Sequence, residues 1–342
     1  MNPDAIVYEI FAKEIIKRCY ADEEPDEIYQ WMAAEIKRML GEVDNSAIMT
    51  WGESFVLVND MMAEFEKIAN TPIKERKLLT FPWSSWNKLI DPLKKGMLGV
   101  VTAPDGFGKT IYAESIAEHW ANHKNKIVFV HYELNREIMM MRRTARHTGI
   151  TTREFETGKL SQEQKDRISK TKEVLLSWEG YITYLHTPGW TMEKTVMELM
   201  GLAQRQECDA VVFDYLEKAT ASKRQLQMYG TNMYQREADN VEQLKTFSES
   251  TGIPVLMIAQ MNKEGKGQSF DKVDRSDIRG AGEKSDKANL VVLLSRERIK
   301  TGYSNEISVL VDKNTMGACG AFKQMMKPEY FRVADIETER KP

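Results

Sequence analysis

Residues 103–110 read Ala-Pro-Asp-Gly-Phe-Gly-Lys-Thr, between an apolar run at 97–102 and a stretch of helical pattern at 111–119. A strand that turns through glycines into Gly-Lys-Thr and then into a helix is the pattern of a phosphate-binding loop. The glycines let consecutive backbone N–H groups converge on one point, to which the helix N-terminus adds its positive end. The segment therefore predicts a site for a nucleoside triphosphate.

The polar side chains of this segment have distinct expected roles. Lys109 is placed to reach the terminal phosphates, and the Thr110 hydroxyl to hold Mg²⁺. Asp105 is unusual, because a carboxylate repels bound phosphates unless it points outward. The alternative is a strand-to-helix turn that only resembles such a loop. Our predicted nucleotide-binding segment consists of Ala103, Pro104, Asp105, Gly106, Phe107, Gly108, Lys109 and Thr110.

Three residues at the ends of other expected strands extend this site. In open α/β sheets, ligand-binding groups gather at the carboxyl ends of the strands. Glu133 can orient and deprotonate the attacking water, and Asp214 ends a hydrophobic run as in the Walker B pattern, where the acid holds Mg²⁺. Gln260 can hydrogen-bond the terminal phosphate through its amide. Taken alone, Glu133 is better explained as a surface or capping acid, and Gln260 equally well as a plain polar strand end.

A basic, glycine-containing segment follows at 276–287. Two glycines among Arg and Lys allow a backbone to approach a phosphate chain closely, and the segment has no aromatic residue on which bases could stack. We predict that Arg279, Gly280, Gly282 and Lys284 contact the backbone of a nucleic acid. An ordinary solvated turn is the alternative.

The elements that must position these residues alternate along the chain. Three amphipathic helical patterns come first, at 5–19, 25–40 and 53–69. Short apolar runs then alternate with helical stretches, at 98–102, 127–132, 181–185, 210–213, 255–258, 290–294 and 307–311. This alternation predicts an α/β fold with a mostly parallel sheet covered by helices on both faces. About a hundred residues separate Asp214 from the phosphate loop, which leaves room for two strand–helix units between them, as in RecA-like proteins.

Composition limits the classes of protein. The chain has 342 residues, 42% of them apolar, enough for one large or two medium domains with a real core. Its three cysteines are far apart and show no paired spacing, which argues against a disulfide framework or a zinc site. The first residues lack the basic start of a signal peptide, and no apolar run approaches the roughly 20 residues of a membrane span. We therefore expect a cytoplasmic protein that does not enter a membrane.

Charge divides the chain in two. Residues 1–70 carry 15 acidic and 6 basic residues, a net charge of −9, which leaves +6 on the remainder. We expect a nucleic-acid site in the second part, and either protein contacts or a solvated surface in the first. Residues 70–77 form a polar linker with a proline, so we predict an acidic α-helical region at 1–70 and a second domain at 71–342.

In order, these motifs resemble the motor domain of the DnaB-type hexameric replicative helicases of bacteria and their phages. His-Tyr-Glu-Leu at 131–134 resembles the family's Ser-Leu-Glu-Met, and Asp-Tyr-Leu at 214–216 is the family's own text. Ala-Gln-Met-Asn-Lys at 259–263 resembles Ser-Gln-Leu-Asn-Arg, and Asp-Ile-Arg-Gly-Ala-Gly at 277–282 resembles Asp-Leu-Arg-x-Ser-Gly of the family's DNA-binding loop. With the segment that leads into the first strand, the resemblance covers about 78–320.

The resemblance implies a RecA-like P-loop NTPase core at 71–342 and a ring of six subunits with ATP and Mg²⁺ bound between neighbours. It also implies single-stranded DNA in the central channel, Glu133 as the catalytic base, and residues 53–69 as a linker helix that docks on the adjacent subunit; a local packing helix is the alternative. A primase or a helicase loader is a candidate partner. The first two helices are shorter than the family's full N-terminal collar.

One position departs from the family. Its final strand ends in Lys-x-Arg, whose arginine reaches the neighbouring subunit's nucleotide, whereas this chain has Lys313 and then Thr315. Lys313 is our candidate for the inter-subunit charge; Lys323, Arg296 and Arg298 are alternatives. The main hypothesis is an ATP-dependent DNA helicase. The alternative is a RecA-like, DNA-associated ATP-binding assembly or loader with weak hydrolysis and no unwinding.

Overall fold

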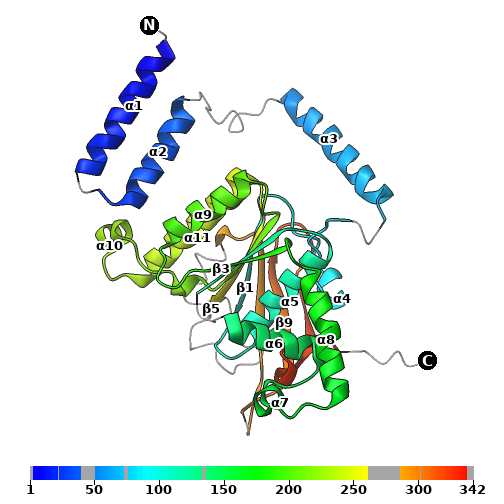
Figure 1. Cartoon of the computed structure of the whole chain (residues 1–342). Coiled ribbons are helices and arrows are strands. Elements are labelled where there is room, and N and C mark those ends of the chain that lie inside the picture. The colour runs from blue at the N-terminus through cyan, green and yellow to red at the C-terminus, as the bar shows by residue number, and fades with distance from the viewer. Residues whose placement is uncertain are drawn as a thin grey trace. The chain divides into compact units, whose positions relative to one another are not determined.

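The computed structural model describes residues 3–21, 23–39, 51–72, 76–132, 136–260, 286–300 and 302–336. By its internal contacts the chain divides into two compact units, residues 1–73 and 74–342. The first contains the helices α1 (Pro3–Tyr20), α2 (Pro25–Met39) and α3 (Trp51–Asn70) (Figure 1). The rings of Phe11 and Trp31 stack where α1 meets α2. Within the described parts of both units, no helix is long and apolar enough to cross a membrane.

The second unit is built on a nine-stranded sheet, in the order β11-β10-β9-β6-β1-β5-β4-β2-β3. The strands from β6 to β3 run parallel, and β9, β10 and β11 add an antiparallel extension. The strands are β1 (Leu98–Ala103), β2 (Ile127–His131), β3 (Ile182–His186), β4 (Ala210–Asp214), β5 (Val255–Gln260), β6 (Leu290–Ser295), β9 (Glu306–Asn314), β10 (Gly320–Lys327) and β11 (Arg332–Asp335). A separate small hairpin consists of β7 (Arg298–Ile299) and β8 (Gly302–Tyr303).

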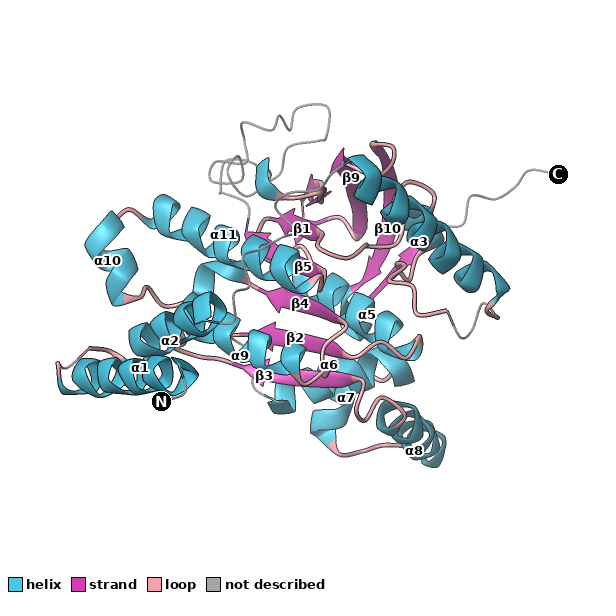
Figure 2. Ribbon diagram, turned by 90° about the horizontal axis from the view of Figure 1, so that it is seen from above, coloured by secondary structure: helices cyan, strands magenta, loops and turns pink. Residues whose placement is uncertain are grey.

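Helices cover both faces of this sheet (Figure 2). Alternate residues of a strand point to opposite faces, and those of β1 divide accordingly. Val101 packs in one hydrophobic core with residues of α5, and Val100 packs in a second core with residues of α9 and α11. The helices of this unit are α4 (Ser84–Asn87), α5 (Lys109–Asn122), α6 (Arg136–Thr148), α7 (Thr152–Thr157), α8 (Gln162–Leu176), α9 (Met192–Gln204), α10 (Lys223–Tyr229) and α11 (Met233–Thr251). The predicted RecA-like α/β class is confirmed.

The strand predicted at 307–311 is present as β9, but it runs antiparallel to β6 rather than parallel. Only the short β7–β8 hairpin lies between β6 and β9 along the chain, whereas a parallel neighbour needs a crossover of a dozen or more residues. The antiparallel β10 and β11 were not predicted, because their alternating polar and apolar residues lack the continuous apolar runs of the central strands.

A buried glutamine joins this extension to the aromatic core beside α5. Gln324 of β10 is fully buried, and its Oε1 accepts hydrogen bonds from Trp86 Nε1 at 3.1 Å and from Tyr112 Oη at 2.7 Å. Its Nε2 donates to Asp335 Oδ1 of β11 at 2.9 Å. One side chain thus joins polar groups from three other segments, α4, α5 and β11.

We predict that Gln324→Leu lowers the free energy of unfolding by about 2–4 kcal/mol, because two buried donors lose their acceptor. Urea denaturation followed by tryptophan fluorescence measures the change. Lys323→Leu, at the exposed neighbouring position, is the control, and we expect it to lower the free energy of unfolding much less, because an exposed ion pair contributes little. Equal destabilisation by the two substitutions would contradict this account of the buried network.

Candidate nucleotide-binding site

The predicted phosphate loop joins the carboxyl end of β1 to the start of α5. Gly106 and Gly108 have φ angles of 80° and 91°, which residues other than glycine rarely adopt. A Cβ at Gly108 would also lie 3.2 Å from Met326 Cε. Gly108 is the N-cap of α5, so no side chain caps the helix and its first backbone N–H groups face the loop. The loop therefore presents an uncapped helix N-terminus, a geometry that favours an anion.

Lys109 is held inside the loop. Its side chain is 8% exposed, and Nζ donates to the carbonyl oxygen of Ala103 at 2.7 Å and to Asp105 Oδ1 at 3.4 Å. Burial lowers the pKa of Lys109, an effect opposed by the carboxylates of Asp105, Glu217 and Asp214. The ammonium group is therefore positioned and surrounded by negative charge.

Arg296, which follows β6, supports the loop from within the same chain. Its NH1 donates to the carbonyl oxygen of Gly106 at 3.2 Å, and Nε donates to the carbonyl oxygen of Ser304 at 2.6 Å. The side chain is 8% exposed, with its guanidinium 5.9 Å from the centre of the Phe107 ring. These contacts commit Arg296 to its own subunit, which argues against it as the inter-subunit charge.

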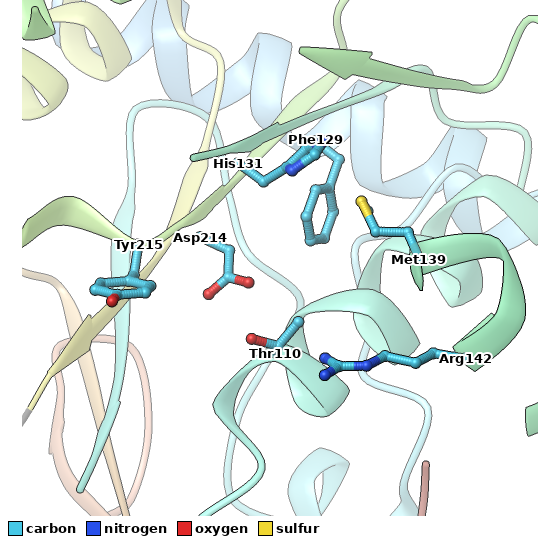
Figure 3. Close-up of a pocket in the computed structure, with 7 residues that line it drawn as sticks. All are labelled: Thr110, Phe129, His131, Met139, Arg142, Asp214 and Tyr215. Carbon is cyan, nitrogen blue, oxygen red and sulfur yellow. The ribbon is translucent and has the colours of Figure 1, made fainter. Parts of the chain in front are cut away.

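A cavity of about 130 Å³ opens beside the loop (Figure 3). The Thr110 hydroxyl and the Asp214 carboxylate lie near each other on its wall, so the loop and the end of β4 meet as predicted. Asp214 is 7% exposed. A hydroxyl and a carboxylate are the oxygen ligands that Mg²⁺ prefers, so this donor set fits the ion. The cavity is lined by Thr110, Phe129, His131, Met139, Arg142, Asp214 and Tyr215.

Two residues of this cavity were missed in the sequence. Arg142 reaches from α6 toward Thr110 (Figure 3). Burial lowers the pKa of Arg142, and the Asp214 carboxylate opposes this effect. The sequence feature that could have identified Arg142 is its position one helical turn after the buried Met139. His131 is 3% exposed, and neither ring nitrogen has a hydrogen-bond partner among the residues that the structure describes. Burial, with smaller contributions from His186 and Arg136, lowers the pKa of His131 to about 4, so the ring is neutral at pH 7.

Buried ion pairs fix α6, and with it Arg142, against α5. Glu118 accepts from Arg143 Nε at 2.8 Å and from Arg146 NH1 at 3.2 Å. Arg146 also pairs with Glu114, one turn earlier on α5. Since α5 starts at the phosphate loop, the same helix positions the loop and the arginine that faces it.

Gln260 lies beside the loop, as predicted. The register of β5 on β1 pairs Gln260 with Ala103. Its backbone N–H donates to Glu217 Oε1 at 2.9 Å, and its Nε2 donates to Asp105 Oδ2. The amide therefore contacts the loop through Asp105, the residue that looked unusual in the sequence.

The remaining predicted site residues are Lys313 and five that the structure does not describe. Glu133 lies outside the described residues, as do Arg279, Gly280, Gly282 and Lys284. Lys313 pairs with Val291 near the amino end of β6, whereas the phosphate loop follows the carboxyl end of β1. Its Nζ donates to the carbonyl oxygen of Asp286 at 2.9 Å. Within one subunit, Lys313 is therefore displaced from the phosphate loop along the strands.

The fold and the loop define the class of RecA-like P-loop proteins. Residues 81–335, well over half of the chain, match the family model described as DnaB-like helicase C terminal domain. The chain therefore belongs to this family, as its motifs had indicated.

Named relatives agree with this assignment. The chain is 22% identical over 275 residues to the replicative DNA helicase DnaB of Buchnera aphidicola subsp. Baizongia pistaciae, covering 78% of this chain and 58% of that protein. It is 23% identical over 255 residues to DnaB of Geobacillus stearothermophilus, covering 73% and 55%. The chain thus spans little more than half the length of the curated relatives it matches.

A solved structure of a DnaB-like replicative helicase, described with its interactions with primase, superposes with a TM-score of 0.74 at 15% identity. The superposition covers 98% of this chain and 76% of that one. At this identity the likeness establishes the fold alone.

We predict that Arg142→Ala weakens binding of Mg²⁺-ATP by about tenfold or more, because a charge-assisted contact to the phosphates is lost. Titration with a fluorescent ATP analogue measures the affinity. Arg142→Lys should retain part of this affinity. Arg153 is an exposed arginine on α7, so Arg153→Ala should leave the affinity unchanged. Unchanged affinity in Arg142→Ala would remove Arg142 from the site.

Proposed function

We propose that this protein is an ATP-dependent DNA helicase that translocates on single-stranded DNA during replication. The observation that carries the proposal is the cavity beside the phosphate loop, where Thr110 and Asp214 meet at the carboxyl ends of β1 and β4. The family assignment and the replicative helicases among the relatives support the same activity.

The residues of the site divide the work as follows. Lys109, Arg142 and the N-terminus of α5 hold the phosphates of ATP, and Thr110 and Asp214 hold Mg²⁺. The ion neutralises charge that develops on the phosphates. Gln260 contacts the terminal phosphate, and Glu133 orients and deprotonates the attacking water.

The proposed DNA binding and oligomer formation are supported by the family assignment. We propose a ring of six subunits around single-stranded DNA, with the DNA backbone contacted by Arg279, Gly280, Gly282 and Lys284. Such contacts make binding dependent on salt and tolerant of sequence. A primase or a helicase loader is the proposed protein partner, a suggestion that the primase-associated structural neighbour supports.

A second candidate is a DNA-associated ATP-binding assembly with weak hydrolysis and no unwinding. Thr315 favours it, because a trans-acting arginine raises phosphoryl-transfer rates by about a thousandfold or more where it is present. The two candidates differ in strand displacement on a forked DNA substrate. ATP-dependent displacement supports the helicase, and ATP-dependent assembly on DNA without displacement supports the second candidate.

We predict that Lys109→Ala abolishes ATP binding and that Asp214→Asn lowers the hydrolysis rate by about a hundredfold or more while leaving binding measurable. Steady-state hydrolysis with and without single-stranded DNA, together with equilibrium binding, separates the two effects. Thermal melting of both variants must match the parent protein. Hydrolysis at the parent rate in Asp214→Asn would refute the assignment of this acid to Mg²⁺.

We predict that Lys313→Ala lowers DNA-stimulated ATP hydrolysis by about a hundredfold, because Lys313 acts on the nucleotide of the neighbouring subunit. The affinity of the isolated subunit for ATP should stay unchanged. Lys327→Ala, a lysine at the end of β10, is the control. Thr315→Arg restores the family's Lys-x-Arg motif and should raise the rate of ATP hydrolysis at least about tenfold. Full activity in Lys313→Ala would end the lysine hypothesis.

A further inference from the structure

Asp105 makes contacts that are unexpected for a carboxylate in a phosphate loop. Its Oδ1 lies 3.4 Å from Lys109 Nζ, and its Oδ2 accepts a hydrogen bond from Gln260 Nε2. The carboxylate thus bridges the loop lysine and the side chain at the end of β5. The Asp105 side chain is 62% exposed, so the bridge lies on the open side of the loop.

The two groups that Asp105 joins are those the proposed function assigns to the terminal phosphate of ATP. A phosphate oxygen and a carboxylate oxygen are both anionic acceptors, and each satisfies an ammonium group and an amide N–H in the same way. Two anions cannot share these donors closely without repulsion. The Asp105 carboxylate and the terminal phosphate therefore exclude one another.

We propose that Asp105 sets the discrimination between nucleoside triphosphate and diphosphate by competing with the terminal phosphate for Lys109 and Gln260. The inference rests on the proposed function, because it requires a nucleotide in this loop. Binding of ATP turns Asp105 outward, where its exposure allows water to solvate the carboxylate. Binding of ADP leaves the contact with Gln260 in place, since no phosphate reaches that amide.

Asp105 thereby ties the end of β5 to the loop in one nucleotide state and releases it in the other. Gln260 exchanges one anionic acceptor for another, and its backbone remains anchored by Glu217. The exchange lowers the apparent affinity for triphosphate, because a competing contact must break first. The same exchange lowers the affinity for the diphosphate less.

The experiment measures dissociation constants of the full chain for β,γ-imido-ATP and for ADP, each with Mg²⁺, by calorimetry. In Asp105→Asn and Asp105→Ala we expect binding of the triphosphate analogue to tighten about tenfold, and that of ADP to tighten by no more than about threefold. Asp91→Asn, which removes an exposed carboxylate before the amino end of β1, is the control for general electrostatics and should leave the ratio unchanged. Equal tightening for both nucleotides, or no tightening, would overturn the proposal.

A double-mutant cycle with Gln260→Ala tests the mechanism. If Asp105 competes through Gln260, the gain in triphosphate affinity from Asp105→Ala shrinks in the Gln260→Ala background. An undiminished gain overturns the role of Gln260. Failure of the proposed function has a different signature: the parent protein then binds neither nucleotide, or Lys109→Ala binds both as well as the parent does.

Discussion

The register of the parallel strands around β1 is the constraint on which the site depends. Ala103 at the end of β1 pairs with Gln260 at the end of β5, and His131 at the end of β2 pairs with Asp214 at the end of β4. Because neighbouring parallel strands end at one edge, groups from distant parts of the sequence converge there without long side chains having to reach. A shift of one residue in either pair would turn the affected side chains to the opposite face of the sheet.

Around this edge, basic side chains lie close to acidic ones. Lys109 is buried and lies within the field of three carboxylates, those of Asp105, Asp214 and Glu217. On α5 and α6, Glu114 and Glu118 are paired with Arg143 and Arg146, whereas the arginine that precedes both on α6, Arg142, lines the cavity. Separating α5 from α6 would leave these buried charges without partners, which is costly. The ion pairs therefore hold the two helices together beside the cavity.

Lys313 and Thr315 lie at a distance from the cavity beside the phosphate loop. The cavity is formed within one subunit, whereas Lys313 and Thr315 follow the antiparallel β9 back toward the amino end of β6. The position at which this chain departs from the family's Lys-x-Arg therefore lies away from the cavity of its own chain.

Sequence alone determined the class of fold and predicted the phosphate loop and two of the side chains beside it. The seven expected strands were found within a few residues, because buried parallel strands are continuous apolar runs that stand out between helices. The phosphate loop, Asp214 and Gln260 were recognisable because each follows such a run directly. The antiparallel direction of β9, and the strands β10 and β11, depend on pairing partners that local pattern does not specify. Tertiary structure also decided the surroundings of Arg142, His131, Arg296 and Asp105. Their contacts join segments from 4 to 190 residues apart, and an arginine on a helix or an aspartate in a loop has no partner until the chain has folded.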